Sequence, residues 1–201
     1  MIPTAQSPSN DDRQWFISGR WQEYDGESRA NLLRVCGIAS FYFVELLNRA
    51  NVTPVFHTAV TALAAAWLMT SWAVYVSLKR RVFPSAMKFL STGVDLLLLT
   101  CLLLLADGPR SPLVVGYFFV LSLAVLRFSV PLLRFATAGA VLSYLAVAGQ
   151  AAWKRPALAV SWNFGLIVCL ALALCGTTLG QALRRVRGFA EDYARRRAEG
   201  L

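Results

Sequence analysis

The chain has 201 residues, of which 57% are hydrophobic and 15% are charged, and its mean hydropathy is +0.52. Soluble domains carry about 25% charged residues, so this composition excludes an ordinary soluble protein. The formal net charge of +9 points to anionic lipid headgroups rather than to nucleic acid, because the basic residues flank long apolar runs.

Residues 1–29 are expected to form a cytoplasmic polar and aromatic tail, without the apolar run of a cleavable signal peptide. Ser9 and Asn10, followed by two acids, predict the start of a short helix that ends near Ile17. The tail either lies against the headgroup region, which suits amphipathic rings, or is a simple linker. The aromatic residues in question are Trp15, Phe16, Trp21 and Tyr24.

Six apolar runs follow, and they predict an all-α fold, a polytopic transmembrane bundle of six helices over residues 30–183. The second run has 20 uncharged residues, the length that a helix needs to cross the hydrocarbon core. The fourth has only 14, about 21 Å of helix, so it is short unless Arg127 snorkels or the helix begins at Ser111. The expected spans are 30–48, 59–78, 89–106, 113–126, 135–153 and 157–183.

Two of the connections carry proline. Between the third and fourth runs, Gly108, Pro109 and Pro112 cannot continue a helix, so a membrane hairpin with a tight turn is expected. Residues 127–134 contain Pro131 and two arginines, and a loop is expected there.

The distribution of lysine and arginine predicts the orientation. With both termini in the cytoplasm, the inside segments hold 15 of the 20 basic residues, the outside segments hold 4, and Arg34 lies within the first span. The positive-inside rule therefore predicts a multi-pass protein of the cell inner (cytoplasmic) membrane with both termini cytoplasmic.

Charged residues inside the spans are candidates for a functional site, because a charge at membrane depth is costly. Arg34 and Asp95 lie at similar depth from the cytoplasmic side, so an ion pair between them is expected, either as a structural fastening or as a functional element. On the outer side, Glu45 and Arg49 are four residues apart and can pair on one helix face. A polar rim, which either receives a ligand or proton or is an ordinary surface, is expected from Glu45, Asn48, Arg49, His57, Asp107 and Arg110.

The sequence predicts neither an enzyme nor a cofactor or metal site. It has one histidine, no CxxC pair, and none of the motifs GxSxG, HExxH or a glycine-rich phosphate loop.

The last span ends in a GxxxG motif that continues into a short heptad-like seam, so the helix is expected to run on into the cytoplasm to about Arg195. Residues 184–201 would then be a basic cytoplasmic helical tail. This stretch either mediates a homodimer or is an interfacial helix held by anionic lipid. The candidate contact stripe is Gly176, Gly180, Leu183, Val186 and Ala190.

Three short stretches carry a resemblance: GPRSP at 108–112, YFF at 117–119 and LRF at 126–128. The arrangement resembles the N-terminal multi-span sensory modules of bacterial histidine kinases and of nucleotide or diguanylate cyclases. In those proteins a catalytic domain follows the last span, and no such sequence precedes Leu201 here. The resemblance thus implies an orphan sensor or accessory subunit with a separate kinase or cyclase partner.

Two functions remain open from the sequence. The first is a non-catalytic integral membrane sensor or scaffold subunit of bacterial signalling that passes state changes through the sixth helix. The alternative is a small permease or channel that uses Asp95 and Glu45. Transporters often have repeats and broken helices, whereas no proline lies within the predicted spans and the two halves are not similar, which favours the sensor.

Overall fold

A computed structural model describes the backbone over residues 10–80 and 84–198, where every regular element is a helix. The predicted all-α bundle of six helices is thereby confirmed. The α-helices are α1 (Asn10–Leu47), α2 (Pro54–Lys79), α3 (Ser85–Leu105), α4 (Val115–Leu126), α5 (Val130–Lys154) and α6 (Trp162–Ala198). Short 3-10 turns, Arg49–Asn51, Gly108–Arg110, Pro112–Val114 and Pro156–Leu158, lie in three of the connections.

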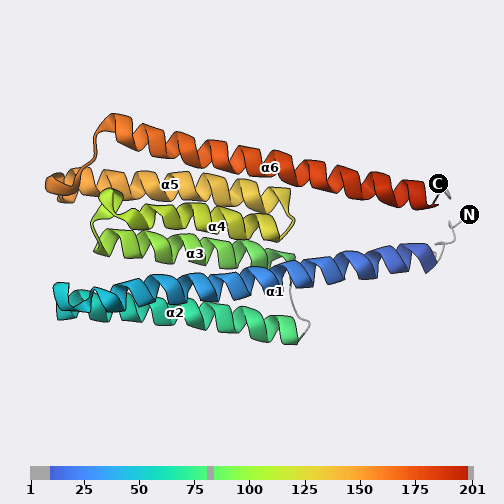
Figure 1. Cartoon of the computed structure of the whole chain (residues 1–201), viewed down its shortest axis with the longest axis horizontal. Helices are drawn as coiled ribbons and strands as arrows, with labels where there is room; N and C mark the ends of the chain where they lie inside the picture. The colour runs from blue at the N-terminus through green and yellow to red at the C-terminus, as the bar shows by residue number, and fades with distance from the viewer. Residues whose placement is uncertain (1–9, 81–83, 199–201) are drawn as a thin grey trace, which may run out of the picture.

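The helices run up and down, so both ends of the chain lie at one end of the bundle (Figure 1). We call this the terminal end; it also holds the end of α2, the start of α3 and the α4–α5 connection. The opposite end holds the α1–α2, α3–α4 and α5–α6 connections.

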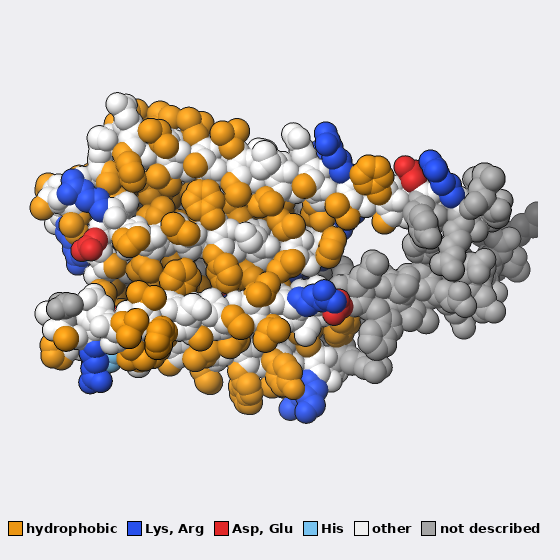
Figure 2. All heavy atoms as spheres, viewed as in Figure 1, with side chains coloured by type: hydrophobic (Ala, Val, Ile, Leu, Met, Phe, Trp, Pro, Cys, Tyr) orange, Lys and Arg blue, Asp and Glu red, His pale blue; other side chains and the backbone are white. Residues whose placement is uncertain are grey.

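Five of the helices are long and apolar enough to cross a membrane. Figure 2 shows hydrophobic side chains over the visible face of the bundle and lysine and arginine side chains towards its two ends. Many large apolar residues are exposed on the bundle, among them Trp72, Leu97 and Leu170. An apolar belt of this kind is what lipid contact requires, so the chain is a membrane protein.

The core lies among α3, α4, α5 and α6. Its fully buried residues include Leu103, Tyr117, Leu132, Tyr144 and Leu172. The α1–α2 hairpin forms a second layer beside this core (Figure 1) and contributes few buried apolar residues of its own.

The fourth helix is the central one, because it contacts α1, α3, α5 and α6. It has 12 residues, about 18 Å of helix, which is less than the hydrocarbon thickness. Six of its residues are buried, and buried residues also lie before it (Gly108 and Pro109) and after it (Arg127 and Ser129), so protein covers most of this short helix. Neither predicted way of lengthening it applies, since Arg127 turns inward instead of snorkelling and the α-helix begins only at Val115.

The predicted loop over 127–134 is wrong. Phe128 takes a left-handed conformation (φ 48°) that ends α4, and α5 already begins at Val130. Pro131 lies in the first turn of α5, where the missing N–H costs no hydrogen bond. The predicted turn at 108–112 is present, with Gly108 at φ 61°.

The first and last helices differ from their predicted bounds. The predicted end of a short helix near Ile17 is wrong, because α1 runs without a proline for 38 residues, about 57 Å. The last span begins at Trp162 rather than at 157, since Pro156–Leu158 forms a 3-10 turn. Its predicted continuation to about Arg195 is confirmed, since α6 extends to Ala198. The prediction for the rings of Trp15, Phe16 and Trp21 falls on side chains outside the described part.

Two glycines let α1 pass close to α4. A Cβ at Gly26 would lie 2.7 Å from the Leu126 carbonyl oxygen, and a Cβ at Gly37 would lie 2.6 Å from the Phe119 ring. Any larger residue at these positions would push the hairpin away from α4.

The up-and-down arrangement predicts which added cysteines share a side of the membrane. In a chain with its four native cysteines replaced, Asp107→Cys and Ala157→Cys should be labelled from one side by an impermeant maleimide. Lys79→Cys and Arg185→Cys should be labelled only from the other side. All four positions are exposed, so labelling should be efficient. Labelling of Lys79→Cys and Asp107→Cys from the same side would contradict the fold.

Candidate functional site

Asp95 of α3 accepts three hydrogen bonds inside the bundle, where it is only 1% exposed. Arg34 donates to its Oδ2 from Nε (3.1 Å) and Nη2 (2.8 Å), and Trp67 Nε1 donates to Oδ1 (2.7 Å). The contact predicted between Arg34 and Asp95 is therefore present. Trp67 brings in α2, which the sequence reasoning missed, although a tryptophan N–H inside an apolar span always needs an acceptor.

The guanidinium of Arg34 is bonded on its other side as well. Nη1 donates to Asn31 Oδ1 (3.1 Å) and Nη2 to Ser91 Oγ (3.3 Å), while Asn31 Nδ2 donates to the Ser71 carbonyl of α2 (3.1 Å). A charge at mid-membrane costs roughly 2.5–3.5 kcal/mol, and this set of partners explains how Arg34 stays buried.

A second buried ion pair lies beside the first. Arg127, just after α4, has its Nη2 2.9 Å from Glu27 Oε1 of α1, and both side chains are at most 3% exposed. This is a close charge contact rather than an aligned hydrogen bond, because neither atom has a hydrogen-bond partner. Arg127 Nη1 donates instead to the Lys88 carbonyl (3.0 Å) and to the Thr92 hydroxyl.

We call Glu27, Arg34, Asp95 and Arg127 the inner charge cluster. Its two pairs are neighbours, because Ser91 and Thr92, which bond to Arg34 and Arg127, are adjacent on α3. The sequence reasoning missed Glu27 and Arg127, which it placed in a tail and a loop. The available signal was the spacing of seven between Glu27 and Arg34, two turns of one helix face.

The inner charge cluster fastens the α1–α2 hairpin to the rest of the bundle. The small cavity beside it, lined by Trp67, Asp95 and Phe119 among others, has a volume of about 10 Å³. That is room for at most one water molecule. Within residues 10–80 and 84–198, no group of three or more His, Cys, Asp or Glu side chains is placed to hold a metal ion.

The predicted outer rim is divided between two helix connections. Glu45 Oε1 lies 3.0 Å from His57 Nδ1, and this contact joins α1 to α2. The expected pairing of Glu45 with Arg49 is wrong, because α1 ends at Leu47 and the chain turns before Arg49 can follow on the same face. Asn48 lies in this turn.

The other part of the rim joins the α3–α4 turn to the α5–α6 connection. Arg110 Nη2 donates to the Ala159 carbonyl (2.7 Å), and Arg155 Nη1 donates to the Ala106 carbonyl (3.5 Å). Asp107 is exposed nearby, at the start of the same turn. None of the six predicted rim residues lines the cavity beside Asp95 or the groove described below, and three of them, Glu45, His57 and Arg110, link one element to another.

The two glycines of the GxxxG motif face α5 of the same chain. A Cβ at Gly176 would lie 2.1 Å from Thr137 Oγ1 of α5, and a Cβ at Gly180 would lie 3.7 Å from Leu133. Leu183 is buried too. Gly176 and Leu183 are thus buried within the chain and present no surface to a second copy, whereas Gly180 is half-buried and Val186 and Ala190 are exposed, so a dimer through this stripe stays a prediction.

Comparison of the chain with models of protein families, with curated proteins and with solved structures gave no match. Its function must therefore be argued from its own geometry.

The inner ion pair makes a prediction about stability. Asp95→Asn should lower the free energy of unfolding in detergent by about 3–5 kcal/mol, because it leaves Arg34 buried without its counter-charge. The double variant Arg34→Gln/Asp95→Asn should be more stable than the sum of the two single changes, as measured by a double-mutant cycle. Strict additivity would contradict a direct interaction.

The close contact of α5 and α6 leads to a second prediction about stability. Gly176→Ala should destabilise the fold by about 1–3 kcal/mol, since its Cβ would overlap Thr137. Adding Thr137→Ala should restore most of the loss. Gly165→Ala, on the same helix with nothing within 4 Å of its Cβ position, is the matched control and should unfold like the wild type. Equal effects at both glycines would argue against the packing.

Proposed function

We propose that this chain is a non-catalytic membrane sensor or scaffold subunit of bacterial signalling, in which a change in the bundle is passed on through α6. The observation that carries the proposal is the buried Glu27–Arg127 pair. It ties α1 to the corner from which the chain turns into α5, and α5 packs along α6.

The two long helices provide the output in this proposal. Both α1 and α6 continue beyond the other four helices at the terminal end, and they come from different layers of the bundle (Figure 1). A shift of the α1–α2 hairpin would pull on Arg127 and hence on the first turn of α5, where Leu133 lies against Gly180 of α6. A separate kinase or cyclase would read the position of α6.

The basic residues support an orientation for this output. The terminal end collects the segments that hold 15 of the 20 lysines and arginines. By the positive-inside rule we place this end in the cytoplasm of a bacterial cell, with the protein in the inner membrane.

The alternative, a small permease or channel, needs a path to Asp95. The space beside that carboxylate is about 10 Å³. Both oxygens of Asp95 accept hydrogen bonds from protein side chains. Glu45, the second acid of that hypothesis, is bonded to His57. These observations favour the sensor over the permease.

The proposal predicts that breaking the Glu27–Arg127 pair moves α1 relative to α6. Spin labels at Ser28→Cys and Phe189→Cys, in a cysteine-free chain in lipid nanodiscs, should give one main distance by pulsed electron paramagnetic resonance. Glu27→Gln should shift or broaden that distribution. Asp25→Asn, which removes the exposed Asp25–Arg29 pair two residues away, is the matched control and should leave it unchanged.

An unchanged distribution in Glu27→Gln would contradict the coupling. A flux assay addresses the alternative: proteoliposomes of the wild type should leak protons and potassium no faster than empty liposomes. A leak that disappears in Asp95→Asn would favour the permease instead.

A further inference from the structure

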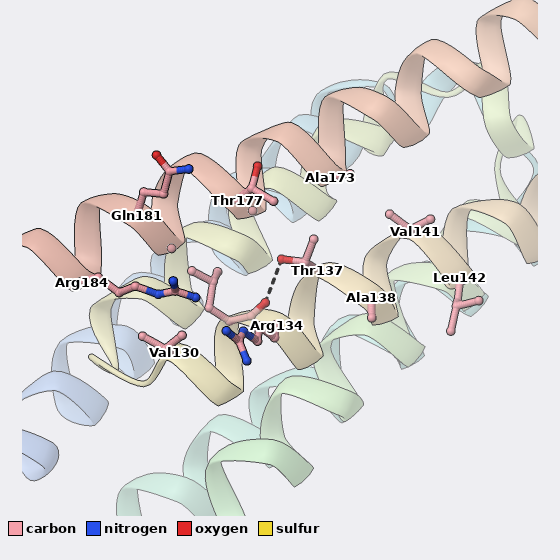
Figure 3. A pocket seen from close by; sticks show the side chains of 13 residues that line it. Val130, Arg134, Thr137, Ala138, Val141, Leu142, Ala173, Thr177, Gln181 and Arg184 are labelled. Carbon is pink, nitrogen blue, oxygen red and sulfur yellow. Dashed lines mark hydrogen bonds between the residues drawn. The ribbon is translucent and has the colours of Figure 1, made fainter.

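A groove of about 640 Å³ lies between α5 and α6 on the surface of the bundle (Figure 3). Its volume falls within the range of small-molecule sites in proteins. It follows α5 from Val130 to Leu142, about three turns, and its rim residues Ala138, Leu142 and Thr177 are exposed. In a membrane protein such a groove opens towards the surrounding lipid.

One end of the groove is strongly basic. Arg134 of α5 and Arg184 of α6 both line it there, and Figure 3 shows Arg184 extending from α6 towards Val130 and Arg134. No acidic residue lines the groove. Neither arginine makes a hydrogen bond or ion pair with another described residue, so two like charges converge without a protein counter-charge.

The rest of the groove is lined mainly by apolar residues, and its other polar residues are Thr137, Thr177 and Gln181. Ala138, Val141 and Ala173 line it, and the backbone of Gly176 forms part of its wall. The one hydroxyl on the α5 side, Thr137 Oγ1, donates to the Leu133 carbonyl (2.8 Å) and is thus satisfied within the helix.

We propose that this groove seats one anionic phospholipid of the bilayer, with its phosphate on Arg134 and Arg184 and an acyl chain along Ala138, Val141 and Ala173. The arrangement of charged and apolar residues along the groove favours this occupant. The arginines lie towards the terminal end, where α5 begins and α6 leaves the bundle, and the apolar part runs from there towards the membrane interior. A lipid has its charge and its hydrocarbon in this same order, whereas a peptide helix or a free phosphate would leave one part unmatched. The inference does not rest on the signalling role proposed above.

The test uses the full chain purified in a neutral detergent. Short-chain phosphatidylglycerol should raise the thermal unfolding temperature in a saturable way, and phosphatidylcholine of equal chain length should have little effect. The variant Arg134→Gln/Arg184→Gln should weaken the apparent affinity for phosphatidylglycerol about 25-fold, since each arginine beside an anionic headgroup contributes roughly fivefold. The control Arg185→Gln/Arg187→Gln removes the same charge from exposed positions outside the groove and should bind like the wild type.

A second variant distinguishes binding of the acyl chain in the groove from simple charge attraction. Ala173→Trp fills the groove and keeps both arginines, so it should also lose the phosphatidylglycerol response while unfolding cooperatively. Glycerol phosphate, which has the anion but no acyl chain, should not raise the unfolding temperature at the same concentration. Equal losses in the two arginine double variants, or full binding by Ala173→Trp, would overturn the proposal; so would equal responses to phosphatidylcholine or glycerol phosphate.

Discussion

An arginine and an aspartate that are shielded from both water and lipid have to remain together, and this requirement determines how the two layers of the bundle meet. Separating Arg34 from Asp95 would leave two charges in a medium that cannot solvate them. Trp67 extends the same constraint to α2, and Arg127 extends it through Glu27 to the corner between α4 and α5. The hairpin therefore has one docking position in which every charge is matched.

Apolar contacts alone would not define that position. In a bilayer, lipid tails are as apolar as leucine, so the hydrophobic effect does not draw one helix to another. The α1–α2 hairpin has few buried apolar residues, such as Ile38, Val60 and Val74, whereas the core is concentrated in the other four helices. Close backbone approach at Gly26 and Gly37 adds van der Waals contact. Polar pairing then selects the register.

The sequence alone was sufficient for the number of helices in the bundle and for one ion pair, but not for all of the helix bounds, and the reasons are physical. Apolar runs of about 20 residues leave a backbone no option in lipid except a helix, and Arg34 and Asp95 are conspicuous because they interrupt such runs. Glu27 lies in a polar stretch and Arg127 follows the end of an apolar run, where a charge is ordinary, so their burial depends on tertiary packing that local patterns do not report. The same holds for Gly176: GxxxG shows that two helices approach closely, but it cannot distinguish α5 of the same chain from a second copy.

The partners of the inner charge cluster are far apart along the chain, and this affects how the protein is made. Arg34 precedes Asp95 by 61 residues, and Glu27 precedes Arg127 by 100. When the first span leaves the ribosome, neither of its charges has a partner, so it is a poor substrate for release into lipid by itself. Its charges can all be paired only after α3 and then the α4–α5 corner have been synthesised. The hairpin that appears first in the chain is therefore the last part whose charges can all be paired.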